Sequence, residues 1–251
     1  MKSTDFPSRD LYDFCQKIEE AGGNKGYRIW EVFDAFVFCS FASLRQAVYK
    51  LTTGVINAEL EAAYLERIKD FPHPEKLAHA LGMLIAALEE KSRDFLGDAY
   101  QALYMANKRA GQFFTPTELC RAMAQMMLGD TKPDPESRLT LGEPAMGGGA
   151  TIIAAVEVLK ANGFGPRDFM VYGTDIDATC FYMAYIQLTL LGIPAVLTRG
   201  DGLWPKPEDT VAPTLVAAMF PLRESQRKRV VEITARTRPT RHPITARTRT
   251  R

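Results

Sequence analysis

The chain has 251 residues, of which 46% are apolar, so it can bury the core of one large domain or of two modest ones. Its 31 basic and 30 acidic residues give a net charge of only +1. Four cysteines, at positions 15, 39, 120 and 180, are scattered without C-x-x-C spacing, which argues against a zinc site or a disulfide framework. With no G-x-x-x-x-G-K loop and no apolar core after Lys2, the sequence also argues against a P-loop ATPase and a secretory signal. We expect free, buried thiols in a cytoplasmic protein.

Apolar residues recur at helical spacing through the first hundred residues. The longest such stretch, 29–50, is rich in Phe but is interrupted by Glu31, Asp34 and Arg45, so we interpret it as a buried amphipathic helix rather than a membrane span. Asn57 is the expected N-cap of a later helix. The predicted helices cover residues 11–20, 29–50, 58–69, 75–91 and 92–107. The sequence therefore predicts a helical bundle over residues 1–110.

A glycine-rich turn, Glu-Pro-Ala-Met-Gly-Gly-Gly at 143–149, separates a strand-like run at 139–141 from an apolar helical stretch at 150–159. Strand, turn and helix in this order are typical of sites for adenosine-containing cofactors, because glycines let the backbone approach a ligand closely. Glu143 is a poor neighbour for a pyrophosphate but a good partner for a cationic ligand. The dinucleotide pattern G-x-G-x-x-G fits only in part, since residue 152 is Ile. The turn therefore favours S-adenosylmethionine as the cofactor.

Two further predicted strands are followed by acids. Residues 170–173 lead into Thr-Asp-Ile-Asp, and residues 195–197 lead into Gly-Asp-Gly at 200–202. Asp175 is placed to hold the two hydroxyls of a ribose, or else it caps the helix that begins near Ala178. We take Asp177 as the better cap and Asp175 as the better ligand. Because three successive strands each end in an acid, we expect one shared cleft.

The order of these motifs resembles that of the N6-adenine DNA methyltransferases, and most closely the modification subunit of type I restriction-modification systems. The matching segments are Gly-Gln-Phe-Phe-Thr-Pro at 111–116, the turn at 143–149, Gly-Thr-Asp-Ile-Asp at 173–177 and Gly-Asp at 200–201, with Asp-Phe-Leu-Gly-Asp-Ala-Tyr at 94–100 ahead of them. The resemblance covers about residues 90–204. It implies an α/β fold in which an N-terminal helical bundle precedes a truncated, doubly wound class I methyltransferase-like sheet.

The resemblance also implies a role for individual residues in binding S-adenosylmethionine. The segment before the sheet would line the adenosyl and methionine ends of the cofactor, the glycine-rich turn would lie under its methionine moiety, Asp175 would hold the ribose, and Asp201 would meet the exocyclic amine of the adenine. The residues implied for cofactor binding are Phe114, Thr115, Pro116, Glu143, Ala145, Gly147, Gly149, Asp175 and Asp201.

The sequence departs from the family where the catalytic residues should be. Members carry an Asn/Asp-Pro-Pro-aromatic tetrapeptide at the end of a fourth strand, whose acceptors polarise the target amine and whose ring stacks on the flipped base. The corresponding stretch, 214–221, contains no Asn, Asp or Pro-Pro, and Phe220-Pro221 could only stack a base. The catalytic residues therefore remain unassigned.

The end of the chain differs sharply in charge from the rest. Residues 223–251 carry ten Lys and Arg against Glu224 and Glu232, a net charge of +8, and nearly repeat Ile-Thr-Ala-Arg-Thr-Arg. We interpret this segment as a basic, low-complexity, disordered tail, either a non-specific contact to nucleic-acid phosphates or, as we favour, an incidental end. The predicted domains are thus 1–110, helical; 111–222, a methyltransferase-like core short enough to be half of a catalytic domain; and the tail.

Two functions remain open. The first is an S-adenosylmethionine-dependent N6-adenine methyltransferase of restriction-modification type, with double-stranded DNA, a separate specificity subunit and a restriction subunit as implied partners, and no membrane. The second is a non-catalytic cofactor-binding or assembly module derived from such an enzyme, which the missing tetrapeptide favours. A nicotinamide-dependent oxidoreductase is disfavoured by Glu143 and by the residue at position 152.

Overall fold

The computed structural model describes residues 6–23, 26–105, 115–206 and 209–220. All of them belong to one compact unit that ends at Phe220. The domain boundaries expected at residues 110 and 222, and the basic tail, lie outside the described residues.

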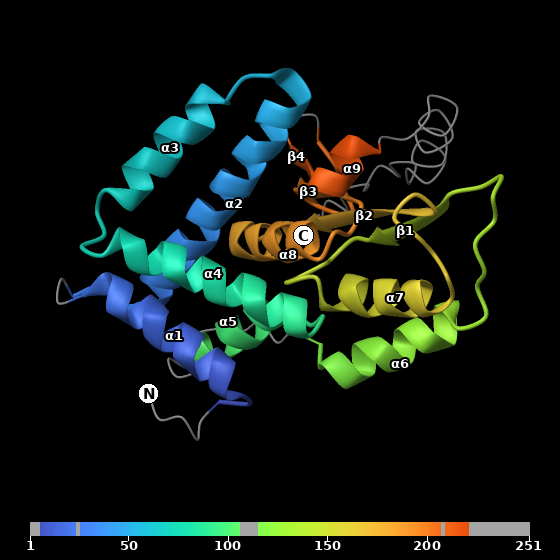
Figure 1. Ribbon diagram of the computed structural model, residues 1–251, viewed down its shortest axis with the longest axis horizontal. Helices are drawn as coiled ribbons and strands as arrows, with labels where there is room; N and C mark the ends of the chain where they lie inside the picture. Colours follow the sequence, from blue (N-terminus) through green and yellow to red (C-terminus); the bar gives the residue numbers. More distant parts are fainter. Residues whose placement is uncertain (1–5, 24–25, 106–114, 207–208, 221–251) are drawn as a thin grey trace, which may run out of the picture. The chain divides into compact units, whose positions relative to one another are not determined.

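The amino-terminal part is helical, as predicted (Figure 1). Its helices are α1 (Arg9–Gly22), α2 (Ile29–Thr53), α3 (Ala58–Ile68), α4 (Pro74–Glu90) and α5 (Phe95–Met105). The predicted cap is confirmed, because Asn57 Oδ1 accepts a 2.9 Å hydrogen bond from the Leu60 amide at the start of α3. Helix α5 begins three residues later than predicted, since the Asp94 side chain accepts the Gly97 amide and so ends the preceding loop.

Phenylalanines form the core of this helical part. Phe14 on α1 is fully buried and meets Phe36 on α2 and Phe95 on α5 edge to face, with ring centroids 5.3 and 5.1 Å apart. The Phe-rich stretch is thus a buried helix, as expected. None of the helices that the structure describes is long and apolar enough to cross a bilayer.

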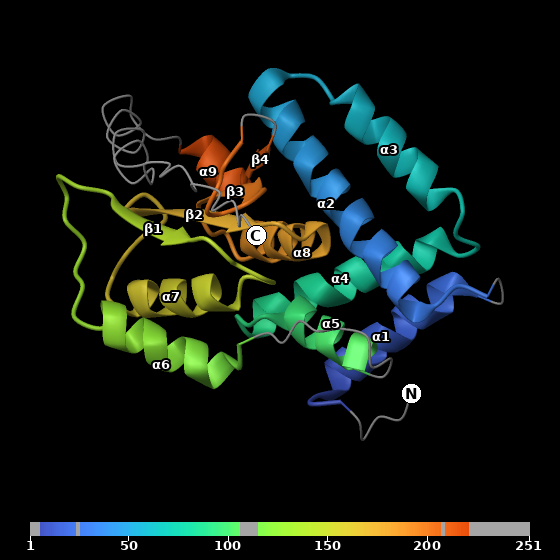
Figure 2. The ribbon, with the colours of Figure 1, turned by 180° about the vertical axis from the view of Figure 1, so that it is seen from behind.

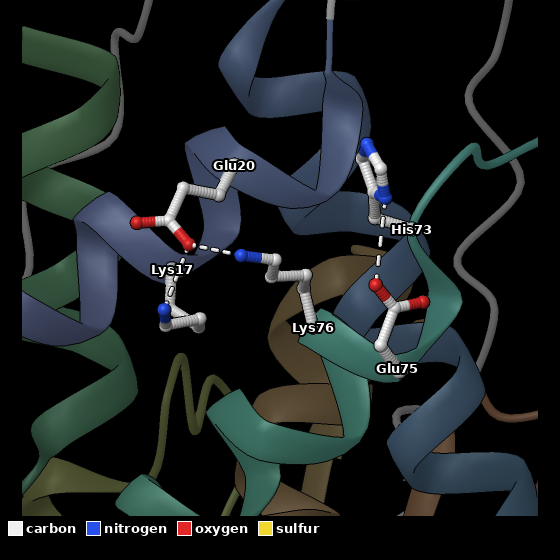
Figure 3. A network of polar contacts seen from close by, with 5 residues as sticks. All are labelled: Lys17, Glu20, His73, Glu75 and Lys76. Atoms are coloured by element: carbon white, nitrogen blue, oxygen red, sulfur yellow. Dashed lines mark hydrogen bonds and ion pairs between the residues drawn. The ribbon is translucent and has the colours of Figure 1, made fainter.

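An ion pair joins α1 to α4 at the surface. Glu20 Oε2 accepts hydrogen bonds of 2.7 Å from both Lys17 and Lys76, and His73 lies 3.4 Å from Glu75 nearby (Figure 3). The two ammonium groups lower the pKa of Glu20 to about 2. Because this carboxylate is in water, screening leaves the pairs a small share of the stability.

The second part is built on a four-stranded sheet in the order β1-β2-β3-β4, with β1 (Leu139–Glu143), β2 (Phe169–Asp175), β3 (Ala195–Arg199) and β4 (Thr210–Pro213). The first three strands are parallel, and β4 is antiparallel to β3. The prediction of a helical amino-terminal part followed by an α/β sheet is confirmed.

Helices cover one face of this sheet. Helix α7 (Ala150–Ala161) connects β1 to β2 and α8 (Ala178–Leu190) connects β2 to β3, so right-handed crossovers place both on the same face. Helix α6 (Thr117–Leu128) packs on α7, and α2 packs on α8, which lies between the helical part and the sheet (Figures 1 and 2). The sheet is therefore anchored to the helical part through α8.

The opposite face of the sheet is more open among the described residues. Its side chains include exposed Thr140 and Val211 and half-buried Val196 and Thr198, and the short helix α9 (Leu215–Met219) contacts only β3 and β4 of the sheet to a significant extent. Among the described residues, the sheet is thus covered by long helices on one side only.

Candidate functional site at the carboxyl edge of the sheet

The glycine-rich turn begins where β1 ends. Gly147 has φ +54° and Gly149 has φ +102°, backbone conformations that a side chain would strain. The Met146 amide donates to Thr174 O at the end of β2 over 3.0 Å, and α7 starts directly after Gly149. The turn therefore points the amino end of α7, with its partial positive charge, toward the carboxyl edge of the sheet.

Asp175 ties this turn to the neighbouring strand. Its Oδ2 accepts the Gly147 amide at 2.8 Å, and its Oδ1 accepts the Asp177 amide at 2.9 Å. Asp177 in turn accepts the Cys180 amide at 2.9 Å and caps α8. The expectation that Asp177 rather than Asp175 caps this helix is thus confirmed, and the Asp175 carboxylate lies beside the turn with lone pairs left for other donors.

Glu143 is held in place by α7. Its Oε1 accepts the Ala145 amide at 3.1 Å and its Oε2 accepts the Thr151 hydroxyl at 2.9 Å. Thr151 was missed by the sequence analysis, although a hydroxyl two residues after the last glycine, in the first turn of the predicted helix, could have indicated it. The half-buried carboxylate of Glu143 is thereby fixed at the end of β1.

The loop after β3 returns to the same place. The Gly200 amide donates to Asp175 O over 2.9 Å, and a Cβ on Gly202 would collide with Pro144. Asp201 Oδ1 accepts the amides of Leu203 and Trp204, at 2.9 and 3.2 Å, and so holds its own loop. The structure therefore brings the ends of β1, β2 and β3 together, as the sequence predicted.

Exposed apolar side chains flank these acids. Ile176, next to Asp175, is 72% exposed, and Leu203 and Trp204, which follow Asp201, are 75% and 53% exposed. Sequence analysis assigned them no role, and their position within three residues after the acids is the signal that could have found them. They offer apolar surface to a flat ligand at the edge where the polar groups lie.

Thr115 and Pro116 directly precede α6. Both are exposed, and Pro116 is the N-cap residue of α6, while Phe114 lies outside the described residues. Asn162, just after α7, donates to Leu128 O and Gly129 O at the end of α6, over 2.8 and 3.1 Å, so the two helices run parallel. The segment before α6 therefore arrives beside the glycine-rich turn that precedes α7.

The expected position of the catalytic stretch is wrong. Residues 214–220 do not follow a parallel fourth strand but come after β4, which runs antiparallel to β3, and they form α9. Thr214 Oγ1 donates to Ile193 O at 2.8 Å and accepts the Ala195 amide at 3.0 Å, both at the amino end of β3. The stretch thus lies at the edge of the sheet opposite the acids.

Phe220 lies at the same opposite edge of the sheet. Its ring lies 4.5 Å from the Arg167 guanidinium carbon, and its carbonyl accepts a 2.9 Å hydrogen bond from Arg138, which precedes β1. Phe220 cannot stack on a base held near Asp175, so the prediction that Phe220-Pro221 could stack on the target base is wrong for Phe220. Pro221 lies outside the described residues. The direction of a strand is set by its partner, which a local apolar run does not reveal.

Comparisons with solved structures find methyltransferases at low similarity. A type I restriction-modification system methyltransferase subunit from Streptococcus thermophilus is 16% identical with a TM-score of 0.43, over 80% of this chain and 60% of that one. A protein named as a class I S-adenosylmethionine-dependent methyltransferase from Listeria monocytogenes is 16% identical with a TM-score of 0.48, over 79% and 55%. A modification subunit of a type I restriction enzyme from Vibrio vulnificus is 18% identical with a TM-score of 0.36, over 76% and 35%. The chain thus spans about 35 to 60% of the length of these proteins.

Sequence comparison identifies the family. No curated protein sequence matches the chain. The family model of the N-6 DNA methylases matches residues 91–219, which contain the glycine-rich turn and all three acids. Because this match spans just over half of the chain, the protein belongs to the N-6 DNA methylase family.

Proposed function

We propose that this chain binds S-adenosylmethionine at the carboxyl edge of its sheet, as part of an N6-adenine DNA methylation system of restriction-modification type. The observation that carries the proposal is the hydrogen bond of 2.8 Å between the Gly147 amide and Asp175, because it holds a glycine-rich turn and an acid together at one edge. Family membership supports the same class of cofactor.

The groups at this edge fit S-adenosylmethionine in their chemistry. Asp175 retains acceptor capacity for the ribose hydroxyls, and Glu143 supplies a fixed negative charge for the cationic methionine end. Exposed Ile176 and Trp204 provide apolar surface for the adenine, with Asp201 near its exocyclic amine. Thr115, Pro116, Ala145 and Gly149 complete the proposed binding residues, together with Phe114. When bound, the cofactor would supply the methyl group.

Among the described residues, we find no group that provides for the chemical step. Methylation of the adenine amine needs acceptors that withdraw its protons and a ring that stacks on the flipped base. Residues 209–220 contribute neither at the edge where the cofactor would bind, because Phe220 lies at the other edge. This observation favours the second candidate function, a non-catalytic cofactor-binding or assembly module derived from such a methyltransferase.

The proposed partners follow from the proposed role in a restriction-modification system. They are double-stranded DNA, a specificity subunit that selects the sequence and a restriction subunit, in the cytoplasm. If the basic segment 223–251 is not an incidental end, its net charge of +8 would add salt-dependent contacts to phosphates.

Transfer of a tritiated methyl group from S-adenosylmethionine to unmethylated duplex DNA separates the two candidates. We expect no incorporation above background with the purified chain alone, even under conditions in which the cofactor is bound. Incorporation that depends on Asp175 would establish the first candidate, a complete methyltransferase, and would show that residues beyond those described carry the chemistry.

A further inference from the structure

A carboxylate that the proposed site does not use is buried behind the glycine-rich turn. Asp94 is only 5% exposed, and its Oδ1 accepts the Gly97 amide at 2.9 Å and the Gln187 Nε2 at 2.8 Å. Burial raises the pKa of this carboxyl group. A buried acid is costly, and it is retained only where its partners compensate.

Gln187 on α8 connects Asp94 to the turn itself. The side chain is completely buried, and its Nε2 donates both to Asp94 Oδ1 and to Gly148 O, each over 2.8 Å. Its Oε1 accepts the Leu96 amide at 2.9 Å. One amide group thus joins the start of α5, the middle of the glycine-rich turn and α8.

The packing around Asp94 requires glycine on both sides. A Cβ on Gly148 would lie 2.8 and 2.9 Å from the two carboxylate oxygens, and a Cβ on Gly97 would collide with them. The carboxylate therefore rests directly against the backbone of the turn. This contact explains Gly148, which has no left-handed φ to account for it.

The turn is consequently held from two sides. Asp175 accepts the Gly147 amide at the edge where the ligand would bind, and Gln187 donates to the next carbonyl, Gly148 O, from behind. Glycines lose more conformational freedom than other residues when they are ordered. Two opposed hydrogen bonds order the peptide between them before a ligand arrives, which lowers the entropy cost of binding.

We infer that Asp94 and Gln187 are positioning residues that fix the glycine-rich turn for the cofactor from outside the binding site. The inference rests on the proposed function only in the identity of the cofactor. It makes the first turn of α5, in the helical part, a determinant of the geometry at the carboxyl edge of the sheet. The competing explanation is that the network only stabilises the folded protein.

The test compares Gln187→Met with a matched control, Thr214→Val, in the full chain. Both side chains are fully buried; Gln187→Met removes three hydrogen bonds and Thr214→Val removes two, but Thr214 lies at the amino edge of the sheet, away from the turn. Asp94→Asn is the conservative variant, because its carbonyl oxygen can still accept from Gly97 and Gln187. Asp94→Ala, which removes the acceptor that orients Gln187, serves if Gln187→Met does not fold, and it should change the same quantities in the same direction.

Two readouts are needed. In Gln187→Met we expect S-adenosylmethionine affinity to fall about tenfold or more, and the Gly147 and Gly149 amides of the free protein to exchange about tenfold faster, beyond any change in global stability. Thr214→Val should lower the thermal midpoint while leaving both quantities within about twofold of the native chain, and Asp94→Asn should stay close to native.

Each outcome supports or overturns the positioning role of Asp94 and Gln187. Equal affinity and equal amide exchange in Gln187→Met and Thr214→Val, at matched loss of stability, would overturn the positioning role. If the native chain does not bind S-adenosylmethionine at all, the proposed function fails, and the amide exchange at Gly147 and Gly149 alone then supports or refutes the positioning of the turn.

Discussion

At the scale of single residues, Asp175 connects the two loops on either side of it at the candidate site. It bonds to the turn after β1 through its side chain, and its backbone carbonyl accepts the Gly200 amide of the loop after β3. Its position is therefore fixed by both neighbouring strands. A ligand with two adjacent hydroxyls would meet an acceptor that needs no rearrangement.

We expect Asp175→Ala to weaken S-adenosylmethionine binding by at least about 100-fold, since it removes two hydrogen bonds to a charged acceptor. Equilibrium dialysis with labelled cofactor measures this. Asp168→Ala is the control, because it removes an equal charge that accepts the Gly165 amide at the other end of β2. If Asp175→Ala binds S-adenosylmethionine with the affinity of the native chain, Asp175 is not the ribose ligand.

Gly147→Val should also abolish cofactor binding, because a branched side chain is strained at φ +54° in the turn proposed to lie under the cofactor. Gly192→Val is the matched control: Gly192 has φ +65°, and no atom lies within 4 Å of the position of its Cβ. Calorimetric unfolding should show a comparable loss of stability in both variants, and binding should survive only in the control. Binding by both would place the ligand elsewhere.

At the scale of elements, the sequence predicted helices and their caps better than it predicted how the strands pair. The helices and the caps at Asn57 and Asp177 were readable because each depends on residues three or four positions apart. The direction of β4 was not readable, because it depends on β3. Nor could the sequence reveal the bond between Asp94 and Gln187, which lie 93 positions apart.

Helix α5 gives a prediction about pH. Burial, followed by the charge of Asp94, raises the pKa of Asp98 to about 6, above its value in an unfolded chain. A raised carboxyl pKa means that the folded state holds the proton more tightly, so its contribution to stability is complete below about pH 4 and is lost as the pH rises toward 6.

Urea unfolding between pH 4 and 7 should therefore show that Asp98→Asn reduces this loss, by about 1 to 2 kcal/mol once solvent screening of the partly exposed carboxylate is counted. A smaller slope of the same sign should remain, since burial also raises the pKa of Asp94. An identical pH profile for Asp98→Asn and the native chain would mean that Asp98 is better solvated than the structure indicates.

At the scale of the whole molecule, the helical part and the sheet share one hydrophobic core. Phe41 on α2 packs against Phe181, Tyr182 and Tyr185 on α8, with ring centroids 5.4, 4.7 and 4.9 Å apart. Since α8 also covers β2 and β3, unfolding of the helical part should expose the sheet.

Phe41→Ala should destabilise both parts together, by about 3 to 5 kcal/mol. The two tryptophans, Trp30 on α2 and Trp204 after β3, report on each part separately when the other is replaced by Phe. Their urea midpoints should shift by the same amount. Leu51→Ala, at an exposed position of the same helix, should change stability by less than about 0.5 kcal/mol. A shift at Trp30 alone would mean that the sheet folds independently.

Titration calorimetry of the purified chain with S-adenosylmethionine tests the central claim most directly. We expect one cofactor to bind per chain, and nicotinamide adenine dinucleotide not to bind, because Glu143 stands beside the turn where a pyrophosphate would lie. If S-adenosylmethionine releases no heat and does not raise the unfolding temperature, the carboxyl edge of this sheet is not a cofactor site, and the chain is an assembly module.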